Sequence, residues 1–164
     1  MGHAVFIHIN QKIEISTQKY LGYTKAMQEA GLAIDPSIVY LGELSLKAGF
    51  GAACQMNARP RLPDAVVAEN DITAIGCLKY FSQKGIKVPA DVAVIGFDNI
   101  QLSALIEPPL STIALPIAQL GLESTRILCS VIENPHEKPK TVILNNELVI
   151  RSSTDPSAPV EFSV

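Results

Sequence analysis

Aromatic residues are scarce in this sequence of 164 residues: they make up 5% of the chain, and tryptophan is absent. Hydrophobic residues nevertheless account for 48% of the chain, and most of them are aliphatic. Strands that are buried on both faces beneath helices typically have this composition. It therefore favours an α/β domain over a β-sandwich, and the length is sufficient for one core of ordinary size.

The chain also lacks an excess of basic residues. Its net charge is -3 and its isoelectric point is near 5.6, and no stripe of Lys and Arg follows any predicted helix. Because attraction to phosphates dominates DNA binding, we expect that this chain alone does not bind DNA. No apolar run is long enough to cross a bilayer, and no secretory leader opens the sequence, so we expect a cytoplasmic protein without a membrane partner.

Motifs of metal sites and enzymes are missing as well. Cys54, Cys77 and Cys129 are far apart and have no metal-ligand spacing, which predicts small core residues in a reducing compartment. There is no nucleophile elbow and no Walker phosphate loop, and Gly49 and Gly51 lack the third glycine of a dinucleotide fingerprint. The histidines are equally scattered, at His3, His8 and His136. The sequence thus indicates no enzyme, no metal and no cofactor.

Strand and helix signals alternate along the chain. Apolar runs predict strands over residues 4–9, 37–41, 65–68, 92–95 and 141–151. Periodic segments with caps predict helices over 16–31, 45–57, 70–84, 100–106 and 116–133, the first with Ser16 as its N-cap. Such alternation predicts a doubly wound, mostly parallel sheet, followed by a loose tail from Ser152 onward.

Polar residues follow two of the predicted strands. Glu69, Asn70 and Asp71 come after the third strand, and Asp98 and Asn99 follow the fourth. Ligands of doubly wound sheets bind at the carboxyl ends of the strands, so we expect Asn70 and Asp98 to face one cleft, where an amide and a carboxylate accept donors from a small polar ligand. Asn and Asp are also common N-caps, and the pattern alone favours capping.

Four segments resemble the LacI/GalR family of bacterial transcription regulators, whose members include the lactose and purine repressors. Residues 63–76 fit PDAVxAxNDxxAxG, residues 85–98 fit GxxVPxDVxVxGFD, residues 108–121 contain PPLST followed by Pro116 and Leu120-Gly121, and residues 147–154 fit ELVxRxST. Gly22 and Tyr23 fit a weaker upstream motif. These segments follow the family's order and cover nearly the whole chain.

The resemblance implies a type I periplasmic-binding-protein-like effector domain, of which this chain supplies mainly the C-terminal lobe. Residues 1–113 would form that lobe, 114–145 would pack on an N-terminal lobe, and 146–164 would be the return strand and tail. Operator DNA would be bound only through a helix-turn-helix headpiece. The effector would be a sugar, a nucleoside or a related polar metabolite.

The resemblance also implies which residues bind the effector. They are Asp98, Asn70, Lys19, Leu44, Leu115 and Ile117. Lys19 stands where an Arg is usual, and it keeps the charge but loses the planar bidentate fork. Leu44 stands where relatives often have an aromatic residue. The predicted pocket is therefore more aliphatic than in the best-known members.

Two other functions compete with a regulator module. A periplasmic solute (sugar) receptor shares the fold, although the missing leader and the repressor-like PPLST segment count against it. A small doubly wound enzyme using Asp98 and Asp71 as acids or metal ligands is the third possibility, and it lacks a companion nucleophile.

Apolar helix faces predict contacts with a second copy. We expect a homodimer that buries Ile72, Ile75, Leu102, Leu105 and Ile106, unless these residues face the core. The helix over 116–133 carries a second apolar stripe, formed by Ile117, Leu120, Ile127, Leu128, Val131 and Ile132. We expect a second copy to cover this stripe and residues 141–144, unless the helix covers the sheet of its own chain or is displaced.

Overall fold

The computed structural model describes residues 3–8, 13–34, 40–41, 43–136, 138 and 140–159. These residues form a six-stranded sheet with the order β2-β1-β3-β4-β5-β6. The strands are β1 (Ala4–His8), β2 (Tyr40–Leu41), β3 (Ala65–Ala68), β4 (Ala93–Phe97), β5 (Ser111–Ala114) and β6 (Glu147–Val149). All pairs are parallel except β5 with β6, as the predicted fold class requires.

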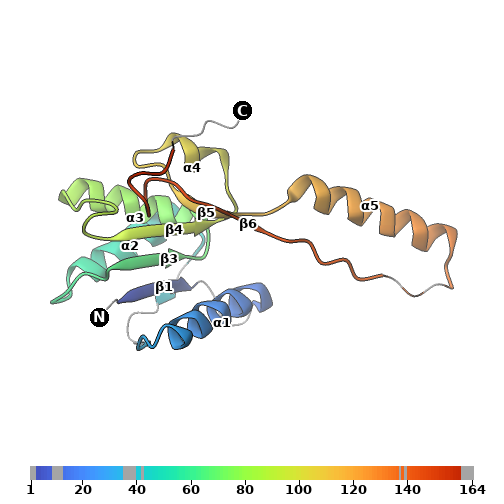
Figure 1. The fold of residues 1–164 in the computed structure, drawn as a ribbon, viewed down its shortest axis with the longest axis horizontal. Helices are drawn as coiled ribbons and strands as arrows, with labels where there is room; N and C mark the ends of the chain where they lie inside the picture. Colours follow the sequence, from blue (N-terminus) through green and yellow to red (C-terminus); the bar gives the residue numbers. More distant parts are fainter. Residues whose placement is uncertain are drawn as a thin grey trace.

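Helices cover both faces of the sheet (Figure 1). They are α1 (Glu14–Glu29), α2 (Leu46–Asn57), α3 (Asp71–Lys84), α4 (Gln101–Leu105) and α5 (Ile117–Glu133). Val66 and Val94 point to one face and are buried with residues of α2 and α3, whereas Phe6 points to the other face and packs on Tyr23 and Met27 of α1. Because side chains alternate along a strand, β1 and β3 contribute to both layers of the core.

Two glycines set the spacing between α2 and α3. A methyl group on Gly49 would overlap the carbonyl of Thr73, and one on Gly76 would overlap the carbonyl of Leu46. The helices therefore cross with backbone against backbone. A methyl group on Gly51 would meet nothing within 4 Å, so of the two glycines in this part of α2 only Gly49 is required by the packing.

Local capping signals predicted most helix ends correctly. Ser45 and Asn70 are N-caps whose side chains accept from Ala48 and Thr73, and α3 ends at Gly85 in the left-handed region. The predicted cap Ser16 is wrong. Helix α1 begins at Glu14 after Ile13, without a side-chain cap, and Ser16 lies within its first turn, where it is buried.

Three further predictions need correction. The last strand spans three residues, not 141–151, because residues 140–146 leave the sheet and run back along the arm that carries α5 (Figure 1). The segment after Ser152 is not loose at its start, since Ser153 is fully buried. Cys77 is buried as predicted, but Cys54 and Cys129 are exposed. The predicted strand residues 37–39 lie outside the described residues.

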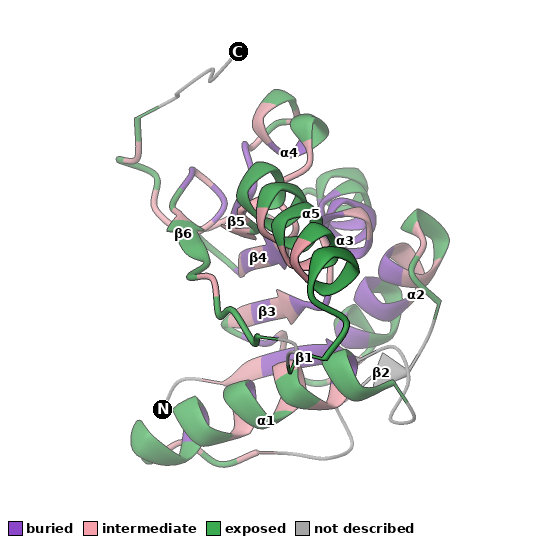
Figure 2. Cartoon of the chain, turned by 90° about the vertical axis from the view of Figure 1, so that its right-hand side faces the viewer, coloured by how far each residue is buried: buried purple, intermediate pink, exposed green. Residues whose placement is uncertain are grey.

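Helix α5 stands apart from the rest of the molecule (Figure 1), and most of it is exposed (Figure 2). None of its residues is buried, and Leu120, Leu128 and Val131 are 53%, 60% and 39% exposed. The alternative that this helix covers the sheet of its own chain is therefore wrong.

Candidate ligand-binding site

A hollow of about 200 Å³ lies at the carboxyl ends of the strands. Its lining comes from the segments that follow β1, β2, β3 and β4: Ile13, Ile15, Lys19, Leu44, Glu69, Asn70 and Asp98. The chain order of the strands reverses between β1 and β3, which are neighbours in the sheet. In doubly wound sheets this reversal opens a crevice between the flanking loops, and ligands bind there.

Lys19 supplies the positive charge of the hollow. Its Nζ donates to the backbone carbonyl of Glu69 at 2.9 Å and lies 4.6 Å from the centroid of the Phe97 ring. The carbonyl and the ring face both favour a cation, so they hold the ammonium group of α1 against the ends of β3 and β4. A free Nζ hydrogen can still donate to a ligand.

Asn70 caps helix α3 and also lines the hollow, which are the two roles considered for it from the sequence. Its Oδ1 accepts from the backbone N–H of Thr73 at 2.9 Å, and its side chain also lines the hollow. The cap uses one of the two lone pairs of Oδ1, so the amide can offer a ligand its Nδ2 donors and the remaining lone pair. That this amide accepts from a ligand stays a prediction.

Asp98 is the acceptor of the hollow. It sits directly after β4, with φ at 103°, and its backbone N–H donates to the carbonyl of Ile113 at 2.9 Å. Burial raises the pKa of its carboxyl group, the charge of Asp71 adds to this rise, and Lys19 opposes it. Capping of α4 by Asp98 is wrong, because Ile100 holds the N-cap position. Asp98 and Asn70 thus follow adjacent strands and line one hollow, the placement predicted from the sequence.

Asp71 fixes the loop that carries Asp98. It is fully buried, and its carboxylate accepts from the Ile100 backbone N–H at 2.9 Å, Ser103 Oγ at 2.7 Å and Thr112 Oγ1 at 2.6 Å. Both oxygens are therefore engaged. A methyl group on Gly96 would overlap this carboxylate, which explains the glycine at the end of β4.

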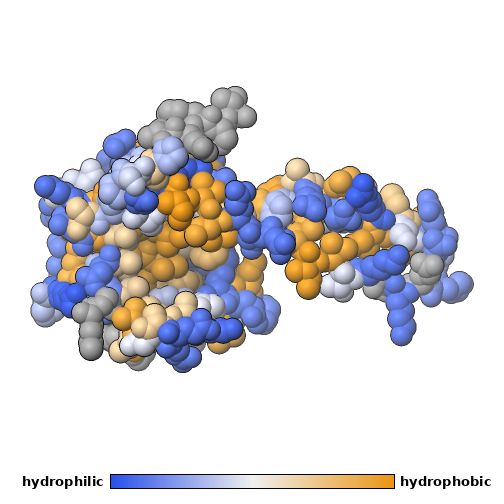
Figure 3. All heavy atoms as spheres, in the orientation of Figure 1, coloured by the Kyte–Doolittle hydropathy of each residue, from blue (hydrophilic) through white to orange (hydrophobic). Residues whose placement is uncertain are grey.

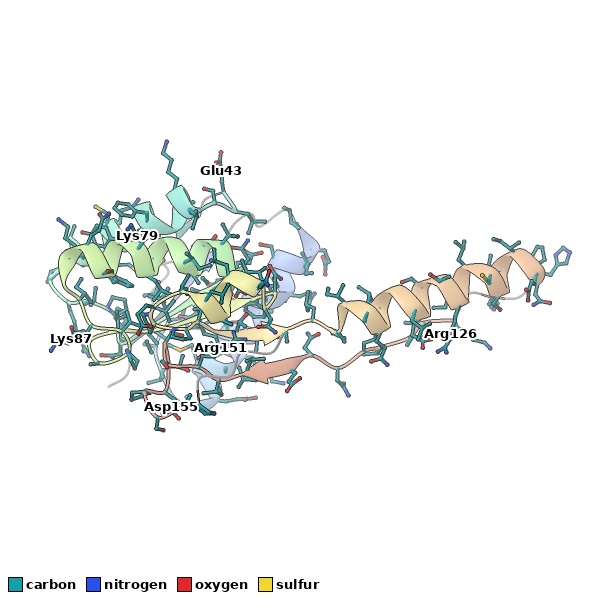
Figure 4. The ribbon with its side chains drawn as sticks, turned by 90° about the horizontal axis from the view of Figure 1, so that it is seen from above. Glu43, Lys79, Lys87, Arg126, Arg151 and Asp155 are labelled. Carbon is teal, nitrogen blue, oxygen red and sulfur yellow. The ribbon has the colours of Figure 1, made fainter. Side chains whose placement is uncertain are left out.

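Arg151 is a second buried anchor that site prediction from the sequence missed. It is 7% exposed, and its guanidinium donates to the Leu110 carbonyl and to Asn99 Oδ1, both at 2.8 Å. Burial lowers its pKa, although the charge of Asp71 opposes this. Figure 4 shows it in the body beside the sheet, whereas Arg126 lies out on α5. The Arg of the ELVxRxST motif was the available signal.

Ser153 of the same motif attaches the chain's return segment to the sheet. Ser153 Oγ donates to the Val94 carbonyl at 2.6 Å and accepts from the Ser111 N–H at 2.8 Å. These bonds bury Ser153 and bring the Arg151 side chain close to the loop after β4.

The structure brings together four of the six predicted effector positions. Lys19, Leu44, Asn70 and Asp98 line the hollow, whereas Leu115 and Ile117 are not among its lining residues. These two are 36% and 61% exposed and lie where the chain leaves β5 for α5. The structure therefore does not place them in this hollow.

Of the five residues predicted to form a dimer contact, some are buried in the core of their own chain and others are exposed. Ile75 is 9% exposed and belongs to the main core, and Ile106 packs against that core, so their apolar character needs no partner. Ile72 is partly buried, and Leu102 and Leu105 are exposed.

Within the described residues, no group of His, Cys, Asp and Glu is placed to hold a metal ion. No helix of that part is long and apolar enough to span a membrane.

Comparison with known proteins identifies the family. The model of the periplasmic binding protein-like domain matches residues 2–154. The HTH-type transcriptional repressor CytR of Escherichia coli (strain K12) is 36% identical over 133 residues, which are 81% of this chain and 39% of the repressor.

Solved structures give the same result. A putative transcriptional regulator LacI from Bacillus cereus subsp. cytotoxis NVH 391-98 superposes with a TM-score of 0.87 at 28% identity, over 92% of this chain and 54% of the regulator. The cellobiose complex of the transcriptional regulator CelR gives a TM-score of 0.84 at 28% identity, over 93% of this chain and 47% of CelR. This chain thus spans about half, or less, of the proteins it matches. It belongs to the periplasmic binding protein-like domain family, in the form found as the effector domain of LacI-type transcription regulators.

Proposed function

We propose that this chain binds a small, hydroxyl-rich effector, with a sugar as the best fit, as the sensory module of a LacI-type transcription regulator. The observation that carries the proposal is the convergence of Lys19, Asn70 and Asp98 on one hollow at the point where the strand order reverses. The relatives reported above are transcriptional regulators, which favours this function over a solute receptor.

The three polar groups of the hollow match hydroxyls. Lys19 Nζ and Asn70 Nδ2 donate, and the Asp98 carboxylate accepts. A hydroxyl both donates and accepts, so neighbouring hydroxyls on one ring can satisfy all three groups. Ile13, Ile15 and Leu44 provide apolar lining for the C–H face of such a ring. The cellobiose complex of CelR supports this ligand class.

The size of the hollow indicates that further protein covers the ligand. Its volume of about 200 Å³ is below the usual ~300–1,000 Å³ of complete ligand pockets. In the two-lobe arrangement, residues 1–113 would form one wall of the ligand pocket, and an N-terminal lobe would form the other wall. Ligand binding between the lobes would shift a two-state equilibrium that a headpiece transmits to operator DNA in the cytoplasm.

The polar contacts of Asp71 argue against an enzyme built on Asp71 and Asp98. Both oxygens of Asp71 accept hydrogen bonds from the protein, so this carboxylate is not available to a substrate. Asp71 therefore cannot serve as the second acid of a catalytic pair with Asp98.

Isothermal titration calorimetry with a panel of sugars, nucleosides and polyols tests the proposal. We expect at least one sugar to bind, and Asp98→Asn to weaken its binding about 10- to 100-fold, because a hydrogen bond to a charged acceptor is worth about 1.5–3 kcal/mol. Asp64→Asn is the matched control, since Asp64 is exposed and lies before β3, at the opposite end of the strands. Equal binding by wild type and Asp98→Asn would contradict the assignment of the site.

A further inference from the structure

The loop after β4 contains two consecutive residues with positive φ. Asp98 has φ at 103° and Asn99 has φ at 51°, and both residues are only partly buried. Asp98 lines the ligand-binding hollow, whereas Asn99 lines a second hollow of about 360 Å³. Residues other than glycine seldom adopt positive φ, and each of these two has open space beside it. Hydrogen bonds to the rest of the protein must therefore hold this part of the loop.

Two neighbouring segments supply those hydrogen bonds. The N–H of Asp98 donates to the Ile113 carbonyl at 2.9 Å, and the N–H of Asn99 donates to Thr112 Oγ1 at 3.2 Å. The side chain of Asn99 has a partner of its own, because its Oδ1 accepts from Arg151 Nη2 at 2.8 Å. The loop is thus held by β5 through its backbone and by the segment after β6 through Arg151.

Arg151 is itself firmly placed. Its backbone N–H donates to Ser111 Oγ at 2.7 Å, and its Nη1 donates to the Leu110 carbonyl at 2.8 Å. The arm gives this segment no support, because no residue of α5 is buried and Figure 3 shows apolar atoms running along the arm in the open. Within the described residues no carboxylate forms an ion pair with Arg151. A buried cation needs acceptors, so the pairing with Asn99 Oδ1 serves both residues.

We propose that Arg151 is a positioning residue for the effector: through Asn99 it sets the place of the neighbouring Asp98 carboxylate in the ligand-binding hollow. This rests on the proposed function, since it takes Asp98 as the acceptor for a ligand hydroxyl. Arg151 is not among the lining residues of that hollow, so its effect on binding passes through the loop and not through a direct contact. Asparagine suits the intermediate position, because it tolerates the left-handed backbone and offers a side-chain acceptor.

A double-mutant cycle measured by calorimetric titration tests this coupling. The variants are Arg151→Met, Asn99→Gly and the double variant, titrated with the sugar that binds wild type best in the panel above. Methionine keeps an apolar stem without the donors, and glycine keeps the positive φ without the acceptor. We expect each single variant to weaken binding about 3- to 30-fold. The double variant should weaken binding no more than the weaker-binding single variant, because both changes remove the same bond. Additive losses, or wild-type affinity in either single variant, would overturn the proposal.

Two further variants separate positioning from loss of stability. Asn99→Asp restores an acceptor for Arg151 and tolerates a positive φ, so its affinity should return to within about threefold of wild type. Met56→Ala removes a fully buried side chain at the end of α2 that is far from Leu44, and it should destabilise the fold without changing the affinity. If either variant binds as weakly as Asn99→Gly, the proposal is wrong.

Hydrogen exchange followed by mass spectrometry gives a readout that needs no ligand. In the ligand-free protein we expect Arg151→Met and Asn99→Gly to speed exchange in a peptide over residues 95–100 at least about 10-fold more than in a peptide over β3, whereas Met56→Ala should not favour the loop. If no sugar binds to wild type, the proposed function fails, but selectively faster exchange in this loop would still support the action of Arg151 through Asn99. Unchanged exchange in the loop would refute that action.

Discussion

Replacing Asp71 by alanine tests how the site is held. The substitution removes three hydrogen bonds to a buried carboxylate, from the Ile100 N–H, Ser103 Oγ and Thr112 Oγ1. Each bond to a charged group contributes about 1.5–3 kcal/mol, and three buried donors would lose their acceptor. Removing the charge also removes its desolvation penalty, which offsets part of this loss. We therefore expect Asp71→Ala to lower the free energy of unfolding by about 3–5 kcal/mol.

Urea titration followed by far-ultraviolet circular dichroism measures this change. Asp64→Ala is the control, because Asp64 is exposed and its ion pair with Arg61 spans 3.0 Å at the surface. Its effect should stay within about 1 kcal/mol. Thr112→Val, which removes one donor, should lie between the two variants, at about 1–2 kcal/mol. If Asp71→Ala is no more destabilising than Asp64→Ala, the carboxylate does not anchor the loop after β4.

Two further predictions follow from close packing and from burial. Gly49→Ala should lower the free energy of unfolding by about 1–3 kcal/mol, because its methyl group meets the Thr73 carbonyl. Gly51→Ala, two residues along the same helix, should raise the free energy of unfolding by up to about 1 kcal/mol in the same urea titration. Equal effects of the two substitutions would contradict the close crossing of α2 and α3. Burial raises the pKa of Asp98 in the folded state, so ionisation of this group destabilises the folded protein. This loss of stability begins as pH rises above the pKa of the unfolded state and is complete above the pKa of the folded state. Asp98→Asn should therefore raise the melting temperature at pH 7, and the gain should vanish below both pKa values; a gain that persists in acid would refute this cause.

Local signals in the sequence were sufficient for most of the fold. The caps Ser45 and Asn70 act on backbone N–H groups three residues away, so the pattern alone locates them. The placement of Asn70 and Asp98 followed from the rule that parallel strands end at one edge of the sheet. These predictions need no knowledge of which distant segments meet.

The errors concern interactions between distant segments. Asp71 bonds residues that lie 29, 32 and 41 positions further along the chain, and no local pattern distinguishes it from a helix cap or a catalytic acid. The last strand was predicted too long because apolar residues recur over 141–151, but a ladder also needs a partner, and β5 has only four residues. Ser153 was assigned to a loose tail, although its partners Val94 and Ser111 are 59 and 42 positions away.

Asp71 and Asp98 lie at the same edge of the sheet but differ in their surroundings. Asp71 and Asp98 follow adjacent strands, but Asp71 is fully buried with both oxygens bonded, whereas no described residue hydrogen-bonds the Asp98 carboxylate. Burial raises the pKa of Asp98 and so disfavours its ionised form. A ligand hydroxyl that donates to this carboxylate would reduce that cost. Asp71 already fixes the loop, so binding of the proposed effector would not have to order it, and this preorganisation would favour affinity.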